Sequence, residues 1–304
     1  MVHTSNQVTF IDASEHAGQR VDNFLKRHLA GVPISHIHKI LRKGEVRVNK
    51  KRIKACYKLQ PGDQVRIPPV AREQAPVSNP PSHAYKYDLP VLFEDENFLI
   101  INKPSGLAVH GGSGLSFGLI ELARRKFGPK VELVHRLDKE TSGCIMLSKN
   151  LTTLRALQAM LHDKKITKIY HAIVKGYMPD KIKVNEPLKK FDAEHASRMV
   201  RVHPLGRQSI TEFVALARAN GYSLVQARPL TGRTHQIRVH AAHIRHPLLG
   251  DERYGDDSSK KTRLCLHARE LNFICPLTNK PINVVADYDK KLTDIIATFQ
   301  TTTR

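Results

Sequence analysis

The chain has 304 residues and carries 49 Lys and Arg against 28 Asp and Glu, which gives a formal net charge of +21 at pH 7. This length predicts two domains of roughly 150 residues each, and a hydrophobic fraction of 40% is too high for a wholly disordered chain. No apolar run approaches the roughly 20 residues that span a bilayer, and the polar N-terminus is unlike a signal peptide. The four cysteines are irregularly spaced, which excludes a disulfide framework or a zinc knuckle. We therefore expect a cytoplasmic protein with reduced thiols whose charge attracts a polyanion, most commonly nucleic acid; a solvated basic surface is the alternative.

The N-terminal elements predict a small α/β unit. Period-two alternation indicates strands at 7–11 and 65–67. Apolar residues at helical spacing indicate helices over 21–29 and 34–43. Gly44 is placed to end the second helix in a left-handed conformation.

Most of the positive charge of this unit lies in one segment. Residues 35–58 hold nine Lys and Arg against a single Glu. They cover the polar face of the second helix and continue through a predicted hairpin turn at Asn49–Lys50, so they form one cationic surface. Such a surface suits the phosphates of structured RNA. The residues expected to bind RNA here are Lys39, Arg42, Lys43, Arg47, Lys50, Lys51 and Arg52.

A proline-rich stretch separates this unit from the rest of the chain. Residues 68–90 contain six prolines and little apolar periodicity, which is typical of a semi-rigid linker. We expect an RNA-binding domain over 1–70, a linker over 71–88 and a second domain over 89–304.

The second domain has longer alternating runs. Strands are expected at 91–94, 98–104, 131–134, 143–148, 169–174, 212–217 and 223–227, and helices at 118–127, 150–163 and 234–246. Consecutive strands with segregated helices predict an α+β fold with a mainly antiparallel sheet.

Two glycine-containing patterns in this domain suggest chemistry only weakly. Gly114-Leu-Ser116-Phe-Gly118 matches the nucleophile elbow of α/β-hydrolases, but a loop precedes it where that motif requires a strand. The glycine cluster at 111–118 matches neither nucleotide-binding pattern. A loop is the simpler interpretation of both.

A series of histidines follows in the predicted helix over 234–246. His235, His240, His243 and His246 recur at intervals that could bring two imidazoles to one metal ion. Three arginines stand among them, and their charge opposes a cation. RNA contact or helix packing is therefore preferred, and we expect no metal site.

One turn carries a stronger signal. Residues 135–143 (HisArgLeuAspLysGluThrSerGly) place Asp138 in a tight turn between two short strands, so the carboxylate is held by its backbone. Residues 231–240 (ThrGlyArgThrHisGlnIleArgValHis) supply arginines that could pair with Asp138 and keep it ionised, as a nucleophile or base requires. An ordinary turn Asp with a surface Arg is the alternative, because turns favour Asp.

These segments resemble a known family. The Asp138 turn is similar to the catalytic motif of the RluA-type pseudouridine synthases, and residues 102–112, 168–176, 231–240 and 246–255 resemble its accompanying motifs in the same order. Residues 19–25 and 40–49 resemble the alpha-L RNA-binding module of ribosomal type. Arg245 departs from the family pattern, which often has Gly before His-Pro, and so does Cys275 at a position where His is usual.

The resemblance assigns a role to each of several residues. It makes Asp138 the catalytic carboxylate, acting as nucleophile or base, and Arg238 its ion-pair partner. Tyr170 would stack on the uracil, although a strand tyrosine packed in the core is the alternative. Arg136 would fill the gap left by the flipped-out nucleotide, or contact a phosphate, and Arg233 would bind RNA.

The function implied by this resemblance is the site-specific isomerisation of uridine to pseudouridine in 23S ribosomal RNA of the large subunit. Isomerisation moves no electrons or groups between molecules, so no cofactor is expected. We expect a monomer whose partner is ribosomal RNA and which does not bind membranes. The alternative is a non-catalytic RNA-binding or ribosome-assembly factor, for which the basic domain alone would suffice.

Overall fold

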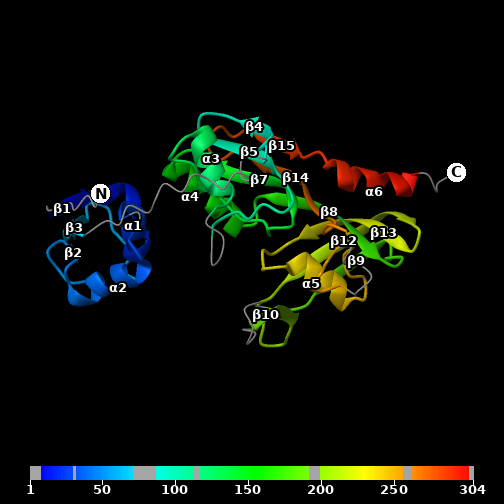
Figure 1. Cartoon of the computed structure of the whole chain (residues 1–304), viewed down its shortest axis with the longest axis horizontal. Coiled ribbons are helices and arrows are strands. Elements are labelled where there is room, and N and C mark those ends of the chain that lie inside the picture. The colour runs from blue at the N-terminus through cyan, green and yellow to red at the C-terminus, as the bar shows by residue number, and fades with distance from the viewer. Residues whose placement is uncertain are drawn as a thin grey trace. The chain divides into compact units, whose positions relative to one another are not determined.

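The computed structural model describes residues 8–29, 32–70, 87–111, 117–191, 199–255 and 262–300. The chain divides into two compact units, Met1–Asn79 and Pro80–Arg304, the first of which is blue in Figure 1. Residues 71–86, which make up most of the expected linker, and Ser116 of the hydrolase-like pattern lie outside the described residues. Among the helices that the structure describes, none combines the length and apolar character needed to cross a membrane.

The N-terminal unit is a three-stranded antiparallel sheet with two helices. Its elements are β1 (Thr9–Asp12), the short 3-10 helix η1 (Ser14–His16), α1 (Val21–His28), α2 (Ile34–Lys43), β2 (Arg47–Val48) and β3 (Gln64–Ile67). The strand order is β1-β3-β2. Phe24, Leu25 and Ile37 of the two helices are fully buried in one core with Val65 of β3, so the expected helices and strands are confirmed.

Two local conformations shape the cationic surface of this unit. Gly44 ends α2 with φ of 72°, and its N–H bonds back to the last turn of the helix. Asn49 and Lys50 both have positive φ and join β2 to the following chain as a tight turn. All seven cations expected to bind RNA, from Lys39 to Arg52, are exposed.

The second unit is built on a ten-stranded sheet, counted over the described residues. Its main path is β4-β5-β7-β14-β8-β13-β12-β9, with β15 beside β14 and β6 beside β7. The strands are β4 (Val91–Glu94), β5 (Phe98–Lys103), β6 (Glu132–Leu133), β7 (Ser142–Ser148), β8 (Thr167–Lys175), β9 (Lys181–Asn185), β12 (Ile210–Ala219), β13 (Tyr222–Pro229), β14 (Leu266–Ile274) and β15 (Pro281–Val285). Among the strands that the structure describes, only β7 and β14 pair in parallel, so the α+β fold with a mainly antiparallel sheet is confirmed. A separate ribbon joins β10 (Leu188–Phe191) to β11 (Met199–Val202).

Helices cover both faces of this sheet. They are α3 (Leu119–Phe127), α4 (Leu151–His162), α5 (Gln236–His243) and α6 (Lys290–Gln300). In β5, Leu99 and Ile101 pack on the α3 side, whereas Phe98 and Ile100 pack on the α4 side. A strand buried on both faces reads as a continuous apolar run, which is what the sequence shows here.

The sheet face that carries α3 also carries α5, and Tyr170 of β8 contacts the apolar clusters of both helices. The expected helix over 234–246 is shorter than predicted, because His235 and Arg245 have φ of 54° and 64° and stand outside α5. The positive φ at Arg245 accounts for the glycine that the family often has there.

Candidate active site

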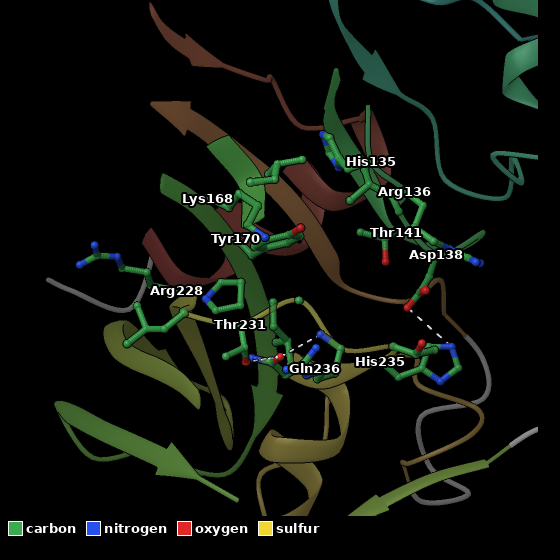
Figure 2. A pocket seen from close by; sticks show the side chains of 18 of the residues that line it. His135, Arg136, Asp138, Thr141, Lys168, Tyr170, Arg228, Thr231, His235 and Gln236 are labelled. Atoms are coloured by element: carbon green, nitrogen blue, oxygen red, sulfur yellow. Dashed lines mark hydrogen bonds and ion pairs between the residues drawn. The ribbon is translucent and has the colours of Figure 1, made fainter. Parts of the chain in front are cut away.

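A cavity of about 800 Å³ opens in the second unit, lined by the Asp138 turn, by β8 and by the chain from Arg228 to Arg238. The five residues to which the resemblance assigned a role in this unit all line it: Arg136, Asp138, Tyr170, Arg233 and Arg238. Figure 2 shows Asp138 and His235 on one side of the cavity and Lys168, Tyr170 and Arg228 on the other. Residues more than 90 positions apart in the sequence therefore meet at one site.

The backbone around Asp138 is fixed by the sheet behind it. The N–H of Thr141 donates to the carbonyl of Asp138 at 3.2 Å, which closes the predicted tight turn. Gly143, at the start of β7, has φ of 106°, and a Cβ there would lie 2.2 Å from the carbonyl oxygen of Ala268. Only glycine permits this approach of β7 to β14, so the Asp138 turn is attached directly to the centre of the sheet.

A buried lysine is hydrogen-bonded to the backbone of the Asp138 turn. The ammonium group of Lys103 donates to the carbonyl oxygens of Pro104, Leu107 and Lys139 at 2.8–2.9 Å, and its side chain is fully buried. Ser105 Oγ donates to the carbonyl of Glu140 at 2.7 Å. Burial lowers the pKa of Lys103 to about 7, while the charges of Glu140 and Asp138 oppose that shift.

Sequence reasoning assigned no role to Lys103. The signal was a lysine at the end of an otherwise apolar strand, PheLeuIleIleAsnLys, followed by Pro and Gly. Three carbonyl oxygens around one ammonium group match its three N–H donors. The lysine thus links the segment at 103–107 to the backbone of the Asp138 turn.

Arg238 divides its contacts between two carboxylates. Its Nε and Nη2 donate to both oxygens of Asp251 at 2.7 and 2.6 Å, and the Asp251 side chain is fully buried. Its Nη1 lies 3.8 Å from Oδ2 of Asp138. Burial acts to lower the pKa of Arg238, but the hydrogen bonds and charge of Asp251 outweigh it and raise the pKa overall. The close, bidentate partner of Arg238 is therefore Asp251, and Asp138 receives a longer contact.

His235 approaches the same carboxylate oxygen. Its Nε2 lies 3.7 Å from Oδ2 of Asp138, and its Nδ1 lies 2.7 Å from the hydroxyl oxygen of Tyr254. The side chain of Asp138 is 23% exposed, against 12% for His235 and 10% for Arg238. The carboxylate is thus the most accessible member of the group and faces the cavity.

Tyr170 forms part of the core and of the cavity wall at once. Its ring packs against the clusters around α3 and α5 and also lines the cavity. Burial raises the pKa of its hydroxyl group, with a smaller contribution from the charge of Asp138, so the phenol is neutral at pH 7. The tyrosine thus packs in the core, as one interpretation expected, and also presents part of its side chain to the cavity.

The rest of the cavity rim is basic. Arg136 and Arg233 are exposed at the cavity, and Nε of Arg233 donates to the carbonyl of Gln208 at 3.2 Å. Lys168 and Arg228 also line the cavity, although the sequence did not single them out. Burial lowers the pKa of Lys168. Nη1 of Arg228 lies 3.9 Å from Oε2 of Glu212, with which it forms an ion pair. A polyanion entering this cavity meets positive charge on several sides.

Two members of the histidine series, His240 and His246, serve packing and local hydrogen bonds. His240 is fully buried and contacts Thr211 Oγ1 at 2.9 Å and the carbonyl of Glu186 at 3.0 Å. Nδ1 of His246 contacts the carbonyl of Lys175 at 2.8 Å. Over the described residues, no three His, Cys, Asp or Glu side chains come together in a way that could hold a metal ion.

Comparison with known proteins identifies the family. A protein of Vibrio cholerae named ribosomal large subunit pseudouridine synthase C is 46% identical to this chain over 94% of its length and 95% of the relative's length. The family model described as RNA pseudouridylate synthase matches residues 97–243. The chain belongs to the RNA pseudouridylate synthase family. The protein of the same name from Escherichia coli K12 is 46% identical, over 95% of each chain.

The remaining comparisons concern the two units separately. An S4 domain model matches residues 19–65, which agrees with the RNA-binding module expected there. Among solved structures, human RNA pseudouridylate synthase domain containing 4 superposes with a TM-score of 0.58 at 26% identity, over 69% of this chain and 93% of that one. Human RNA pseudouridylate synthase domain containing 1 shares the fold, with a TM-score of 0.57 at 22% identity, over 71% of this chain and 96% of that one. The chain is thus an RNA pseudouridine synthase with an N-terminal S4 domain.

Proposed function

We propose that this pseudouridine synthase isomerises specific uridines of 23S large-subunit ribosomal RNA, with Asp138 as its catalytic carboxylate. The named relatives supply the substrate class, and the cavity supplies the observation that carries the proposal. Asp138 is the most exposed member of a group in which Arg238 and His235 both approach its Oδ2 atom. This arrangement presents one oriented carboxylate to a basic cavity.

The reaction balances within the RNA molecule. The bond between N1 of uracil and C1′ of ribose breaks, the base turns, C5 joins C1′, and the proton of C5 is lost while N1 gains one. No electron and no group comes from a second molecule, so we propose that no cofactor takes part. Asp138 serves this reaction in either role open to a carboxylate, attack on carbon or acceptance of a proton.

The residues around Asp138 would place the uridine. The target nucleotide has to leave its helix to reach a cavity of this kind, at the expense of a few kcal/mol of unstacking. Tyr170 would stack on the flipped uracil, and Arg136, exposed beside Asp138, would enter the gap that the base leaves. Arg233 would bind the RNA backbone at the rim.

The two parts of the chain would divide the work. We assign RNA docking to residues 1–70, a connecting role to the linker over 71–88, and catalysis to residues 89–304. The exposed cations from Lys39 to Arg52 would contact phosphates of the ribosomal RNA. In this proposal the protein acts as a monomer in the cytoplasm and does not bind membranes.

Replacement of Asp138 by Asn tests the catalytic assignment. The substitution keeps the shape of the side chain and removes its charge, so folding and RNA binding should persist while pseudouridine formation falls by about 10³-fold or more. Pseudouridine would be mapped in ribosomal RNA incubated with each protein, and RNA affinity measured in parallel. Unchanged conversion would exclude the role of Asp138. Equal losses of binding and conversion would instead mean that Asp138 acts through RNA binding, and absence of conversion by the unaltered protein would favour the non-catalytic alternative.

A further inference from the structure

His235 stands at a backbone position that its neighbours fix firmly. It precedes α5 with φ of 54° and ψ of 20°, a left-handed conformation that non-glycine residues seldom adopt. Gln236 next to it is buried, and its Oε1 accepts hydrogen bonds from Thr231 Oγ1 at 2.7 Å and from the N–H of Arg233 at 3.0 Å. Its Nε2 donates to the carbonyl of Ile210 at 2.9 Å. The turn that presents His235 is therefore held on three sides, and such imposed conformations occur often at functional sites.

The hydrogen bonds of Tyr254 favour one of the two tautomers of His235. The N–H of Val200 donates to the hydroxyl oxygen of Tyr254 at 3.2 Å, so this oxygen already acts as an acceptor. Its own hydrogen is then free to be donated to Nδ1 of His235, 2.7 Å away. With Nδ1 as the acceptor of this hydrogen bond, the proton of a neutral imidazole sits on Nε2, the atom 3.7 Å from Oδ2 of Asp138.

The surroundings keep this imidazole neutral. Burial lowers the pKa of His235, the charges of Arg238 and Arg253 lower it further, and those of Asp138 and Asp251 oppose the shift. Tyr254 faces the ring on its other side, with the centroids 5.5 Å apart. A neutral N–H donor orients a carboxylate without cancelling its charge, which an imidazolium at the same place would do.

The distance to Asp138 suggests when this donor acts. At 3.7 Å the two atoms are too far apart for a hydrogen bond, which needs about 2.9 Å. A displacement of less than about 1 Å would form one, and such contacts commonly tighten when the substrate binds. The same oxygen faces Arg238, whose charge is largely taken up by Asp251.

We propose that His235 is a positioning residue of the reaction, whose Nε2–H donor, set by Tyr254, orients the Asp138 carboxylate in the RNA-bound enzyme. The inference rests on Asp138 being the catalytic carboxylate. Val200 belongs to β11, so the hydrogen bonds also tie the imidazole to the β10–β11 ribbon. The dashed line between Asp138 and His235 in Figure 2 marks the contact on which the proposal depends.

Two substitutions at His235 separate positioning from a structural role. His235→Gln places an amide donor near the former Nε2 and keeps a donor toward Asp138, whereas His235→Asn reaches only the position of Nδ1 and keeps the contact with Tyr254. We expect His235→Gln to retain kcat within about 10-fold and His235→Asn to lose about 100-fold, with KM for RNA nearly unchanged in both.

If His235 had only a structural role, His235→Asn would be the less damaging of the two substitutions. Asn adopts the left-handed conformation more readily than Gln, so the stability of the fold should be higher for His235→Asn than for His235→Gln. Thermal unfolding of both variants would show this order independently of activity. Equal kcat values for the two variants, or a higher kcat for His235→Asn, would overturn the positioning role.

Tyr254→Phe tests the control of the tautomer. It removes the donor to Nδ1 but keeps the ring, whose centroid is 5.1 Å from the Arg238 guanidinium carbon. The imidazole should then accept a proton more readily, so the low-pH limb of the kcat profile should move to higher pH, and kcat should fall about 10-fold. In the His235→Gln background the same change should leave the profile unmoved. An unchanged profile in Tyr254→Phe, or an equal shift in both backgrounds, would refute this control.

The outcomes distinguish this inference from the proposed function. If Asp138→Asn is inactive and both His235 variants behave like the unaltered protein, only the positioning role fails. If Asp138→Asn stays active, the catalytic assignment itself fails.

Discussion

The basic surface of the N-terminal unit and the charged cavity of the second unit use positive charge in different ways. In the N-terminal unit seven cations from Lys39 to Arg52 are exposed and follow one another along a helix and a turn. In the cavity, Arg238 is buried and bonded to a fully buried carboxylate. Exposed charges act additively and are screened by salt, whereas buried charges depend on particular partners. Loss of one charge should therefore matter little on the surface and greatly in the cavity.

Among substitutions of the basic residues, Arg238→Gln should have the largest effect. Loss of the guanidinium leaves the fully buried Asp251 without its bidentate donor, which should lower the free energy of unfolding by about 3–5 kcal/mol. Activity should fall by at least about 100-fold, because Asp138 loses a contact as well. Arg238→Lys keeps the charge but not the two parallel hydrogen bonds. Its stability and activity should therefore lie between those of the unaltered protein and those of Arg238→Gln.

A double variant sharpens the result for Arg238. Arg238→Gln combined with Asp251→Asn removes the unpaired buried charge, so stability should recover while activity stays low. Urea unfolding and pseudouridine assays on the same samples would show this separation. Recovery of both properties together would mean that Arg238 acts only through stability.

Acid should destabilise the second unit through three histidines, of which His267 is buried and His135 and His171 are half-buried. Burial lowers the pKa of His135 to about 3, with the nearby charge of Lys168 contributing, and burial lowers those of His171 and His267 to about 4, from an ordinary 6.5. Between pH 6.5 and 4 the unfolded chain binds more protons than the folded one, so the free energy of unfolding should fall as the pH falls. At pH 5 each histidine accounts for about 2 kcal/mol.

Urea unfolding measured from pH 7.5 to 5 checks this acid sensitivity. His171→Gln should reduce the number of protons taken up on unfolding by about one, because one imidazole no longer titrates. A free energy of unfolding that is independent of pH over this range would show that these imidazoles bind protons as readily in the folded protein as in the unfolded chain.

The smallest effects should come from single cations of the N-terminal surface. Lys39→Ala should weaken RNA binding only about 2- to 3-fold and leave kcat unchanged, because each phosphate contact is one of several. The slope of log affinity against log salt should decrease by about 0.7–0.9 for each contact removed.

Lys26→Ala is the matched control, since Lys26 is an exposed cation of α1 outside the basic segment. It should leave the salt dependence unchanged. Loss of all binding in a single Lys39→Ala variant would mean that this lysine reads a particular feature of the RNA rather than one phosphate.

Much of the fold followed from local pattern. The helices ending at Gly44 and beginning at Leu119 and Leu151, and the strands around Phe98 and Ile145, have strong periodicity and clear end signals. Strands β9, β10, β11, β14 and β15 and helix α6 were not predicted. The sequences of these strands mix polar with apolar residues or are very short, so only pairing with neighbouring strands makes them strands.

The features of the site also separate into those set by local sequence and those set by tertiary structure. The sequence by itself determined the family, the basic surface of the N-terminal unit and the turn at Asp138, because each depends on residues close together in the chain. Only the tertiary structure decided that Arg238 bonds closely to Asp251, that Lys103 donates to the carbonyl of Lys139 in the turn, and that Nε2 of His235 faces Asp138. Partner choice among several nearby carboxylates and carbonyls depends on burial and geometry, and these exist only once distant strands have come together.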